Sequence, residues 1–236
     1  MKAKKENVAI IAAGGRGKRL GIKEGKQYLP LLGKPALFYT LQAFEKNKKI
    51  HRIIVATTPN NFRLLRAMVE KYHFLKVKNL VKAGKKRFDT VKNALRAVLK
   101  NAGLVLIHDG SRLLVSQRLI NEVIKVAQKF GAAVPAILPA DTIKEVNHRG
   151  NVKKTLVRQD LRLIQTPQAF KTSIIKTAYK KITPGKILTD DAAFLEKLGH
   201  SVRIVTGDRN NIKLTYPEDI NYLEFLIRKN EHRFRV

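Results

Sequence analysis

The sequence predicts an α/β fold in which a mostly parallel sheet is covered by helices on both faces. Short apolar runs rich in β-branched residues, clearest at 8–13 and 104–109, alternate with helical patterns of about 10–15 residues. Such alternation favours right-handed crossovers between parallel strands. A polar segment at 141–158 has instead the pattern of a protruding β-hairpin arm. No linker, repeat or low-complexity segment divides the 236 residues, so we expect one domain spanning 1–236.

The individual elements follow from the residues at their ends. Proline suits the first turn of a helix, and Pro35, Pro59 and Pro217 each open a helical pattern. The arm is too polar to be stable alone, so we expect it to lie against another surface, such as a second copy of the chain. We expect strands at 8–13, 51–57, 77–81, 104–109, 132–138 and 202–206, hairpin strands at 142–146 and 152–157, and helices at 35–46, 59–72, 88–100, 116–130, 172–181, from 191 to about 199, and from 217 onward.

The net charge of +30, from 48 Lys and Arg against 18 Asp and Glu, is the strongest compositional signal. It is compatible with a nucleic-acid partner. The cations are spread along the chain, however, and the sequence has no zinc-finger spacing, RNP-like aromatic motif or long basic arm. Nucleic acid is therefore not the expected partner, and a basic nucleic-acid-binding protein on an inactive nucleotide fold is the remote alternative.

The absence of cysteine excludes disulfides and thiolate metal sites and permits a reducing compartment. The basic first residues are followed by only six apolar residues, which is too short for an export signal. No apolar run approaches the length of a membrane span. We expect a soluble, cytoplasmic protein with no membrane partner.

The first predicted strand ends in a glycine loop at 14–17. Glycine lets main-chain N–H groups come close to phosphate oxygens. A dinucleotide-binding fingerprint would need glycine or alanine where Leu20 stands, and the sequence G-x-x-x-x-G-K-[ST] of a P-loop is absent. The loop therefore predicts another kind of polyphosphate site, with positive charge from Arg16, Lys18, Arg19 and Lys26.

A carboxylate follows the predicted strand at 104–109. In an open parallel sheet, ligands bind beyond the carboxyl ends of the strands, so the loops at 13–17, 83–85 and 109–112 should meet there. Magnesium usually takes one or two carboxylates together with substrate phosphates. Asp109 is therefore the candidate ligand for Mg²⁺ or another divalent cation. An Asp-Gly pair after a strand can also be an ordinary turn.

The glycine loop resembles a known signature. Residues 13–20, AGGRGKRL, match the pattern A-[AG]-G-x-G-x-R-[LM] of nucleotidyltransferases that join a nucleoside triphosphate to a phosphorylated sugar or polyol. Further blocks resemble, in order and spacing, the 2-C-methyl-D-erythritol 4-phosphate cytidylyltransferase family of the non-mevalonate isoprenoid pathway. The resemblance covers roughly residues 7–227 and implies a single Rossmann-like nucleotidyltransferase domain. The further blocks are 26–29 (KQYL), 108–112 (HDGSR), 141–144 (DTIK), 166–170 (TPQAF), 189–192 (TDDA) and 211–219 (NIKLTYPED).

This resemblance implies that CTP and 2-C-methyl-D-erythritol 4-phosphate give 4-diphosphocytidyl-2-C-methyl-D-erythritol and pyrophosphate. A phosphate oxygen of the polyol would attack the α-phosphorus of CTP in line, and the protein would supply positioning and charge stabilisation. Mg²⁺ is the implied cofactor. Ribitol 5-phosphate or another alditol phosphate is the alternative second substrate, because the loop chemistry would be the same. The resemblance also implies a homodimer in which the arm at 141–158 reaches the neighbouring subunit's site.

The family pattern further implies roles for individual residues, each carried over by its place in the blocks. The implied catalytic residues are Arg19, Lys26, Arg158 and Lys213, and whether Arg158 acts in its own or the neighbouring subunit is open. The implied nucleotide-binding residues are Ala13, Gly14, Gly15, Gly17, Arg19, Lys26, Gly84, Thr90, Asp109 and Gly110. Binding of the second substrate falls to Asp109, Arg112, Thr142, Arg158, Thr166 and Lys213, and metal binding to Asp109.

Four other conspicuous side chains have structural explanations that we favour. His108 is expected to be a buried hydrogen-bonding residue, since no second histidine or carboxylate cluster is spaced to join it. Asp190 and Asp191 are expected to start a helix rather than to form a metal pair. Tyr216 is expected to serve packing.

Overall fold

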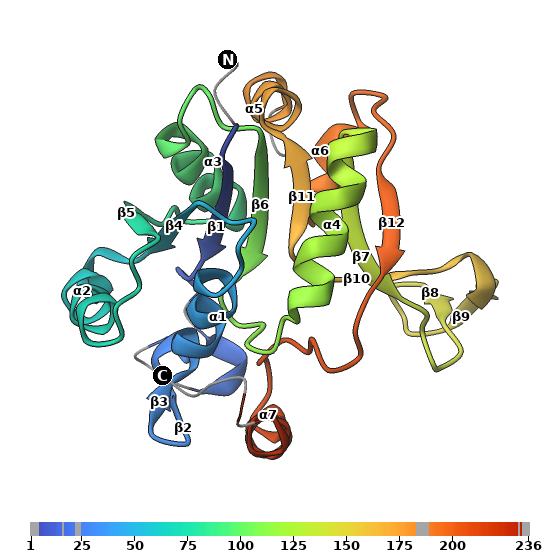
Figure 1. The fold of residues 1–236 in the computed structure, drawn as a ribbon. Helices are drawn as coiled ribbons and strands as arrows, with labels where there is room; N and C mark the ends of the chain where they lie inside the picture. The colour runs from blue at the N-terminus through green and yellow to red at the C-terminus, as the bar shows by residue number, and fades with distance from the viewer. Residues whose placement is uncertain (1–4, 16, 22–24, 183–188, 231, 233–236) are drawn as a thin grey trace.

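The computed structural model describes residues 5–15, 17–21, 25–182, 189–230 and 232, and an eight-stranded sheet runs through this part of the chain (Figure 1). Its strand order is β10-β7-β11-β6-β1-β4-β5, with β12 paired to β7. The strands are β1 (Asn7–Ala12), β4 (Arg52–Thr57), β5 (Val77–Lys82), β6 (Leu104–Asp109), β7 (Ala132–Ile137), β10 (Leu163–Ile164), β11 (Gln168–Lys171) and β12 (Arg203–Thr206).

Most of the sheet is parallel, as predicted. β6, β1, β4 and β5 run in one direction, and β12 is parallel to β7. The exceptions are β11, which is antiparallel to both β6 and β7, and β10, which is antiparallel to β7. The sequence analysis did not anticipate either strand, because segments of four and two residues are too short to show a strand pattern.

Helices cover both faces of the sheet, which confirms the predicted layers (Figure 1). Side chains alternate along a strand, so Ala9 and Ile11 of β1 enter one core and Val8 and Ile10 enter the other. The first core includes α1, α2, α4 and α7, and the second includes α3, α5 and α6. The helices are α1 (Ala36–Glu45), α2 (Phe62–Lys71), α3 (Arg87–Ala97), α4 (Gln117–Phe130), α5 (Thr172–Lys181), α6 (Ala192–Glu196) and α7 (Glu218–Lys229).

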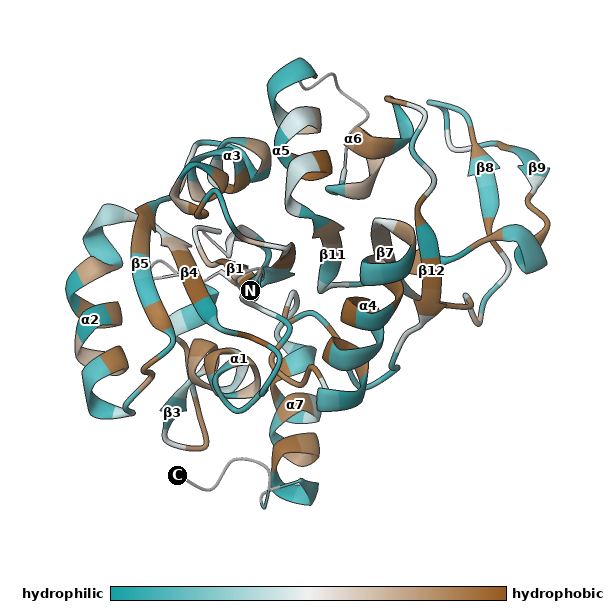
Figure 2. Ribbon diagram, turned by 45° about the horizontal axis from the view of Figure 1, so that its top comes forward, coloured by the Kyte–Doolittle hydropathy of each residue, from teal (hydrophilic) through white to brown (hydrophobic). Residues whose placement is uncertain are grey.

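The ends of α4 illustrate how local residues set these bounds. The Ser116 hydroxyl accepts a hydrogen bond from the Leu119 N–H at 3.2 Å, as an N-cap does. Gly131 follows the last turn with a φ of 98°, a conformation that favours glycine. Between these ends α4 is amphipathic, with hydrophobic residues toward the sheet and hydrophilic ones outside (Figure 2).

Several short elements connect the main ones. The turns at Lys18–Leu20, Lys26–Tyr28, Pro59–Asn61 and Arg158–Asp160 are 3₁₀ helices, and β2 (Pro30–Leu31) pairs with β3 (Lys34–Pro35). The segment 211–215 lies in no helix or strand. No helix in the described ranges has both the length and the apolar character needed to cross a membrane.

The predicted arm is present. β8 (Lys144–Val146) and β9 (Val152–Thr155) form an antiparallel pair that projects from the side of the molecule near β12 (Figure 1). In its turn, the side-chain oxygen of Asn147 accepts hydrogen bonds from the N–H groups of Arg149 and Asn151, both at 3.0 Å. Every residue of the two strands is exposed.

Candidate functional site

A cleft of about 720 Å³ opens where β6 ends and β11 begins. Its position agrees with the rule that ligands bind beyond the carboxyl ends of parallel strands. Cationic side chains from three separate segments meet a single aspartate there. Its lining includes Arg87, Asp109, Arg112, Thr166, Gln168, Asp190 and Lys213.

Asp109 is the electrostatic centre of this cleft and is only 8% exposed. Its Oδ2 lies 2.7 Å from Lys213 Nζ and 3.9 Å from Arg112 Nε, and its Oδ1 lies 3.3 Å from Arg87 Nε. Burial alone would raise the pKa of this carboxyl, but the charges of Arg87, Lys213 and Arg112 hold that pKa well below its ordinary value. Asp109 is therefore ionised at neutral pH.

Thr166 and His108 fix the backbone at Asp109. The Thr166 hydroxyl oxygen accepts a hydrogen bond from the Asp109 N–H at 3.1 Å and lies 2.9 Å from His108 Nδ1. Burial lowers the pKa of His108 to about 4, so its ring is neutral. His108 Nε2 lies 2.9 Å from the Arg112 carbonyl and must be the protonated nitrogen, which leaves Nδ1 to accept the Thr166 proton. His108 is thus the buried hydrogen-bonding residue that the sequence predicts.

Lys26 opens the 3₁₀ helix Lys26–Tyr28 and is 9% exposed. Its Nζ donates a hydrogen bond to the carbonyl of Leu214, the residue next to Lys213. Burial, and then the charge of Lys213, lowers the pKa of Lys26 to about 8. Gly17 has a φ of 66°, and a side chain there would lie 3.2 Å from the backbone nitrogen of Lys26. The glycine loop therefore folds closely over this lysine.

Arg19 is exposed and lies over the ring of Tyr216, 5.5 Å from its centroid. Tyr216 is 51% exposed, so the packing expected of it takes place at the surface, where its ring lies against Arg19. Arg16 and the side chain of Lys18, which the sequence analysis also assigned to this loop, lie outside the described residues.

The three predicted loops meet at the strand ends. The Gly110 N–H donates to the Ala12 carbonyl at 2.9 Å, which joins the loop after β6 to the loop after β1. A Cβ on Gly14 would lie 2.2 Å from the Cβ of Ala83, so the glycine loop touches the loop after β5. The contact at Gly14 leaves no room for a larger residue, and a Cβ on Gly110 would be crowded at 3.1 Å from the Ala12 carbonyl oxygen.

The loop after β5 is itself held by α3. A Cβ on Gly84 would lie 2.1 Å from the Cβ of Asp89, so only glycine fits there. The Gly84 N–H donates to the Thr90 hydroxyl at 3.0 Å, and that hydroxyl lies 3.1 Å from the Lys86 carbonyl. The predicted nucleotide-binding residues of this loop thus form one tightly packed turn beside the glycine loop.

Comparison with known proteins identifies the family. A sequence model of the 2-C-methyl-D-erythritol 4-phosphate cytidylyltransferase family matches residues 7–229. The chain belongs to this family. Proteins with that name from Clostridium perfringens and Clostridium beijerinckii are 40% and 42% identical to it, over 94% and 93% of the chain and 98% and 97% of the relatives.

Solved structures agree with the assignment. A 4-diphosphocytidyl-2C-methyl-D-erythritol synthase from Anaerococcus prevotii superimposes with a TM-score of 0.84 at 28% identity, covering 95% of this chain and 96% of that one. The Francisella tularensis 2-C-methyl-D-erythritol 4-phosphate cytidylyltransferase gives a TM-score of 0.76 at 28% identity, covering 94% and 99%. The Rossmann-like nucleotidyltransferase fold that the resemblance implies is therefore confirmed.

Of the site residues implied for this cytidylyltransferase family member, Asp109, Arg112, Thr166 and Lys213 line the cleft, whereas the two in the arm do not. Thr142 and Arg158 belong to the arm region, both are exposed, and neither is among the described residues that line the cleft. The Arg158 guanidinium instead donates to the carbonyl of Ala140 at 2.8 Å. One chain thus brings together Lys26, Asp109, Arg112, Thr166 and Lys213 but leaves the arm residues apart.

Arg87 is the site residue that sequence reasoning missed. Its Nη2 lies 2.6 Å from Oδ2 of Asp191, which is fully buried and also accepts a hydrogen bond from the Tyr179 hydroxyl. Burial opposes charge on Arg87, but Asp191 and Asp109 outweigh this effect and raise the pKa of the guanidinium. A cation in the first turn of α3 opposes the helix dipole, which is a signal that could have drawn attention to it.

Gln168 and Asp190 complete the wall of the cleft. Asp190 accepts hydrogen bonds from the Ala193 N–H at 3.1 Å and from the Gln168 side chain at 2.8 Å. The expected helix start is therefore confirmed for Asp190, whereas the side chain of Asp191 instead pairs with Arg87. Within the described ranges, no group of three or more histidine or acidic side chains is arranged to hold a metal.

Proposed function

We propose that the cleft around Asp109 transfers the cytidylyl group of CTP to the phosphate of 2-C-methyl-D-erythritol 4-phosphate and releases pyrophosphate. The cluster of Lys26, Lys213, Arg112 and Arg87 beside the glycine loop is the observation that carries the proposal. Two anionic substrates repel each other, so their encounter needs this concentration of positive charge. In the family's reaction these two anions are CTP and 2-C-methyl-D-erythritol 4-phosphate.

The chemistry requires positioning rather than a covalent intermediate. A phosphate oxygen of the polyol attacks the α-phosphorus of CTP, the P–O bond to pyrophosphate breaks, and pyrophosphate carries away the electron pair. Negative charge grows on the five-coordinate α-phosphoryl group. We assign its stabilisation to Lys26 and Arg19, because a buried ammonium and a surface guanidinium flank the glycine loop.

Lys213 and Arg112 are the proposed contacts of the attacking phosphate. The Lys213 side chain is 36% exposed, so a substrate can reach its ammonium from the cleft. Arg112 donates through Nη1 to the Asn211 carbonyl at 2.7 Å, while its buried Nε has no hydrogen-bond acceptor in the described structure. An incoming phosphate oxygen would satisfy that donor. Thr166 supports this site by orienting Asp109.

Asp109 fits the part of a magnesium ligand. The family is one of nucleotidyltransferases, which generally depend on a divalent cation. A single ionised carboxylate at a strand end suits a cation that takes its remaining ligands from phosphates and water. When bound, Mg²⁺ would neutralise charge on the triphosphate. The ion pairs of Asp109 with Lys213 and Arg87 keep this carboxylate ionised and oriented.

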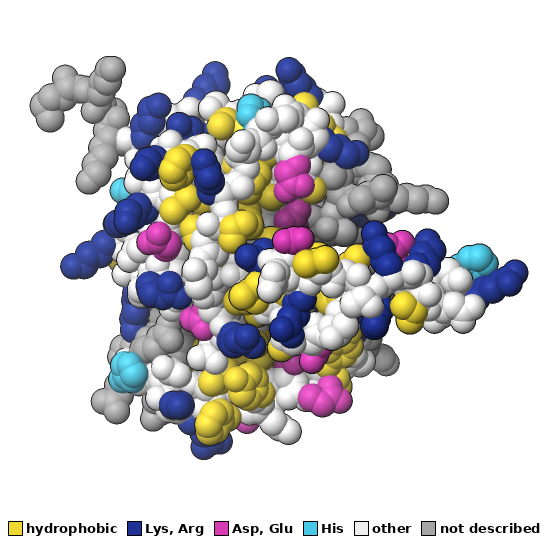
Figure 3. All heavy atoms as spheres, turned by 90° about the vertical axis from the view of Figure 1, so that its right-hand side faces the viewer, with side chains coloured by type: hydrophobic (Ala, Val, Ile, Leu, Met, Phe, Trp, Pro, Cys, Tyr) yellow, Lys and Arg dark blue, Asp and Glu magenta, His cyan; other side chains and the backbone are white. Residues whose placement is uncertain are grey.

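The arm is proposed to complete the site of a second copy of the chain. Val146, Val152 and Val157 are between 52% and 64% exposed, although apolar side chains on a short hairpin gain stability by being covered. Figure 3 shows apolar and basic side chains together on the face that carries the arm. A homodimer formed through 141–158 would cover the valines and bring Arg158 to the neighbouring cleft.

A substrate panel tests the proposed reaction. Pyrophosphate release from CTP should require a divalent cation and should be fastest with 2-C-methyl-D-erythritol 4-phosphate. If ribitol 5-phosphate were the only polyol phosphate turned over, the proposed second substrate would be wrong, but the proposed cytidylyl transfer would stand. Steeply salt-dependent RNA binding without any pyrophosphate release would contradict the reaction itself.

A further inference from the structure

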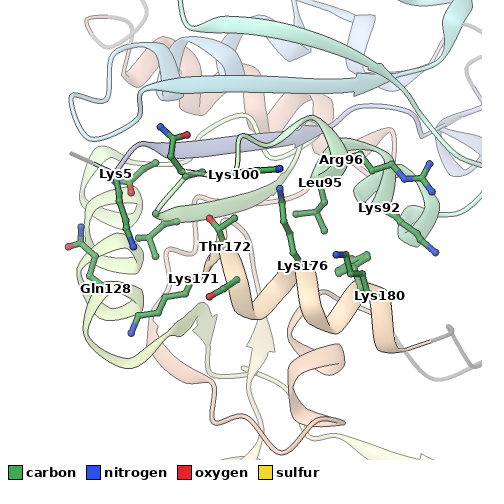
Figure 4. Close-up of a pocket in the computed structure, with 17 residues that line it drawn as sticks. Lys5, Lys92, Leu95, Arg96, Lys100, Gln128, Lys171, Thr172, Lys176 and Lys180 are labelled. Carbon is green, nitrogen blue, oxygen red and sulfur yellow. The ribbon is translucent and has the colours of Figure 1, made fainter. Parts of the chain in front are cut away.

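A second cavity, of about 870 Å³, lies between α3, α5 and the start of β6, and we call it the far basic cavity (Figure 4). Seven Lys and Arg side chains line it, and its described lining contains no carboxylate. Lys100, Lys171, Lys176 and Lys180 are among these cations. The proposed function does not involve any of them.

This cavity is separate from the Asp109 cleft. Leu104 at the start of β6 lines the cavity, and Asp109 at the end of the same strand lines the cleft. Five residue steps along a strand correspond to roughly 17 Å, at about 3.3 Å per residue. One triphosphate chain cannot occupy both places, so the cavity is a site of its own.

The cavity is built as a pocket with an apolar floor. Leu95, Leu104 and Tyr179 are buried side chains of its lining. Figure 4 shows Leu95 with cationic side chains around it. Thr172, at the first turn of α5, is 5% exposed, and its hydroxyl has no hydrogen-bond partner in the described structure. A buried hydroxyl without a partner is costly, and a ligand oxygen in the cavity would satisfy it.

The positive charge in the cavity is uncompensated. None of its seven cations has a carboxylate within ion-pair distance in the part of the chain that the structure describes. Lys176 reaches across to the end of α3, where Nζ donates to the Val98 carbonyl at 2.6 Å. Burial, and then the charge of Lys180, lowers the pKa of Lys176. A bound anion with several charges would reduce both the repulsion among these cations and the cost of burying the Lys176 ammonium.

We propose that the far basic cavity binds a small compound carrying a linear di- or triphosphate, with any organic part resting on the apolar floor. Several cations around one cavity match several phosphate charges better than they match a single one. A cavity of about 870 Å³ also suits a small molecule, whereas a nucleic-acid strand needs an extended basic groove. A nucleoside triphosphate and inorganic polyphosphate share this chemistry.

Calorimetric titration of the full chain with inorganic tripolyphosphate tests the proposal. We expect two kinds of site in the unaltered protein, one of which Lys26→Ala weakens. The triple substitution Lys100→Ser, Lys171→Ser and Lys180→Ser, all at exposed positions, should weaken the other at least tenfold and leave the KM for CTP within about twofold. If ATP bound at that site more tightly than tripolyphosphate, the ligand would be one with an organic part. If the two bound equally, the ligand would be an inorganic polyphosphate.

The matched control removes the same charge elsewhere. Lys48→Ser, Lys78→Ser and Lys229→Ser alter exposed lysines that line neither cavity. Equal loss of tripolyphosphate binding in both triple variants would overturn the proposal, because the attraction would then belong to the overall charge. It would also be overturned if Lys26→Ala removed all binding, or if the cavity lysines were needed for RNA but not for tripolyphosphate.

Discussion

At the scale of single residues, the account depends on groups whose charge is set by their surroundings. Asp109 is kept ionised by three cations, and Lys26 is brought within reach of neutral pH by its burial. The two effects differ in sign: the cations around Asp109 favour its charged form, whereas burial of Lys26 makes its charged form less stable. Two of the predictions below concern these ionised groups.

The first prediction concerns pH. The pKa of Lys26 is lowered to about 8, so its charge is present below that pH and is lost as the pH rises through it. The kcat/KM for CTP should therefore fall above pH 8, because this parameter reports ionisation of the free enzyme. In Lys26→Arg the alkaline fall should disappear, whatever the absolute rate. A pH–rate profile with the same alkaline limb in both proteins would exclude Lys26 as the titrating group.

The second prediction concerns the pair of Arg87 and Asp191. Removing Arg87 leaves a fully buried carboxylate without its cation, and breaking such a pair costs about 3 kcal/mol. Arg87→Met should lower the free energy of unfolding in urea by about that amount, and it should also lower turnover because Asp109 loses a partner. In the double variant Arg87→Met/Asp191→Leu much of the stability should return. Additive losses in this double-mutant cycle would show that the two side chains are not coupled.

At the scale of elements, the site is made by loops that touch. A Cβ on Gly14 would lie 2.2 Å from that of Ala83, so Gly14→Ala should push the two loops apart and raise the KM for CTP about tenfold or more. Gly14 is not among the glycines with a positive φ, so the effect of Gly14→Ala would come from the steric contact and not from backbone strain. Gly14→Ala/Ala83→Gly should recover most of the lost affinity. An unaltered KM in the single variant would contradict the contact.

The arm gives an element-scale prediction about assembly. If Arg158 acts in the neighbouring subunit, mixing Arg158→Ala chains with Lys26→Ala chains should restore activity. Random pairing makes half of the dimers hybrids, each with one complete site, so about a quarter of the sites should be active. Each variant alone serves as the control. Activity of the mixture no greater than that of the separate variants would place Arg158 in the site of its own subunit.

At the scale of the whole molecule, the sequence was sufficient for the layers and for much of the site. Alternating apolar runs predicted the parallel strands and the two covered faces, and the end of β6 placed Asp109 at the correct edge. It did not predict β11, because four residues are too few to show a strand pattern and one of them, Gln168, is polar although it is buried. The buried side-chain oxygen of Gln168 accepts hydrogen bonds from the N–H groups of Asp191 and Ala192 at the start of α6.

Arg87 and the far basic cavity were missed for a different reason. One cation among 48 does not stand out until the fold shows which carboxylate it meets. The cavity joins segments near residues 5, 100 and 176, whose proximity no local pattern records.

The measurement that tests the central claim most directly is the rate of pyrophosphate release from CTP and 2-C-methyl-D-erythritol 4-phosphate in wild-type, Lys26→Ala and Arg19→Ala proteins. Lys78→Ala, at an exposed position outside both cavities, is the charge-matched control. We predict losses on the order of a hundredfold or more in turnover for the first two variants and none for the control. Near-normal turnover in both Lys26→Ala and Arg19→Ala would contradict the proposed stabilisation of the α-phosphoryl group.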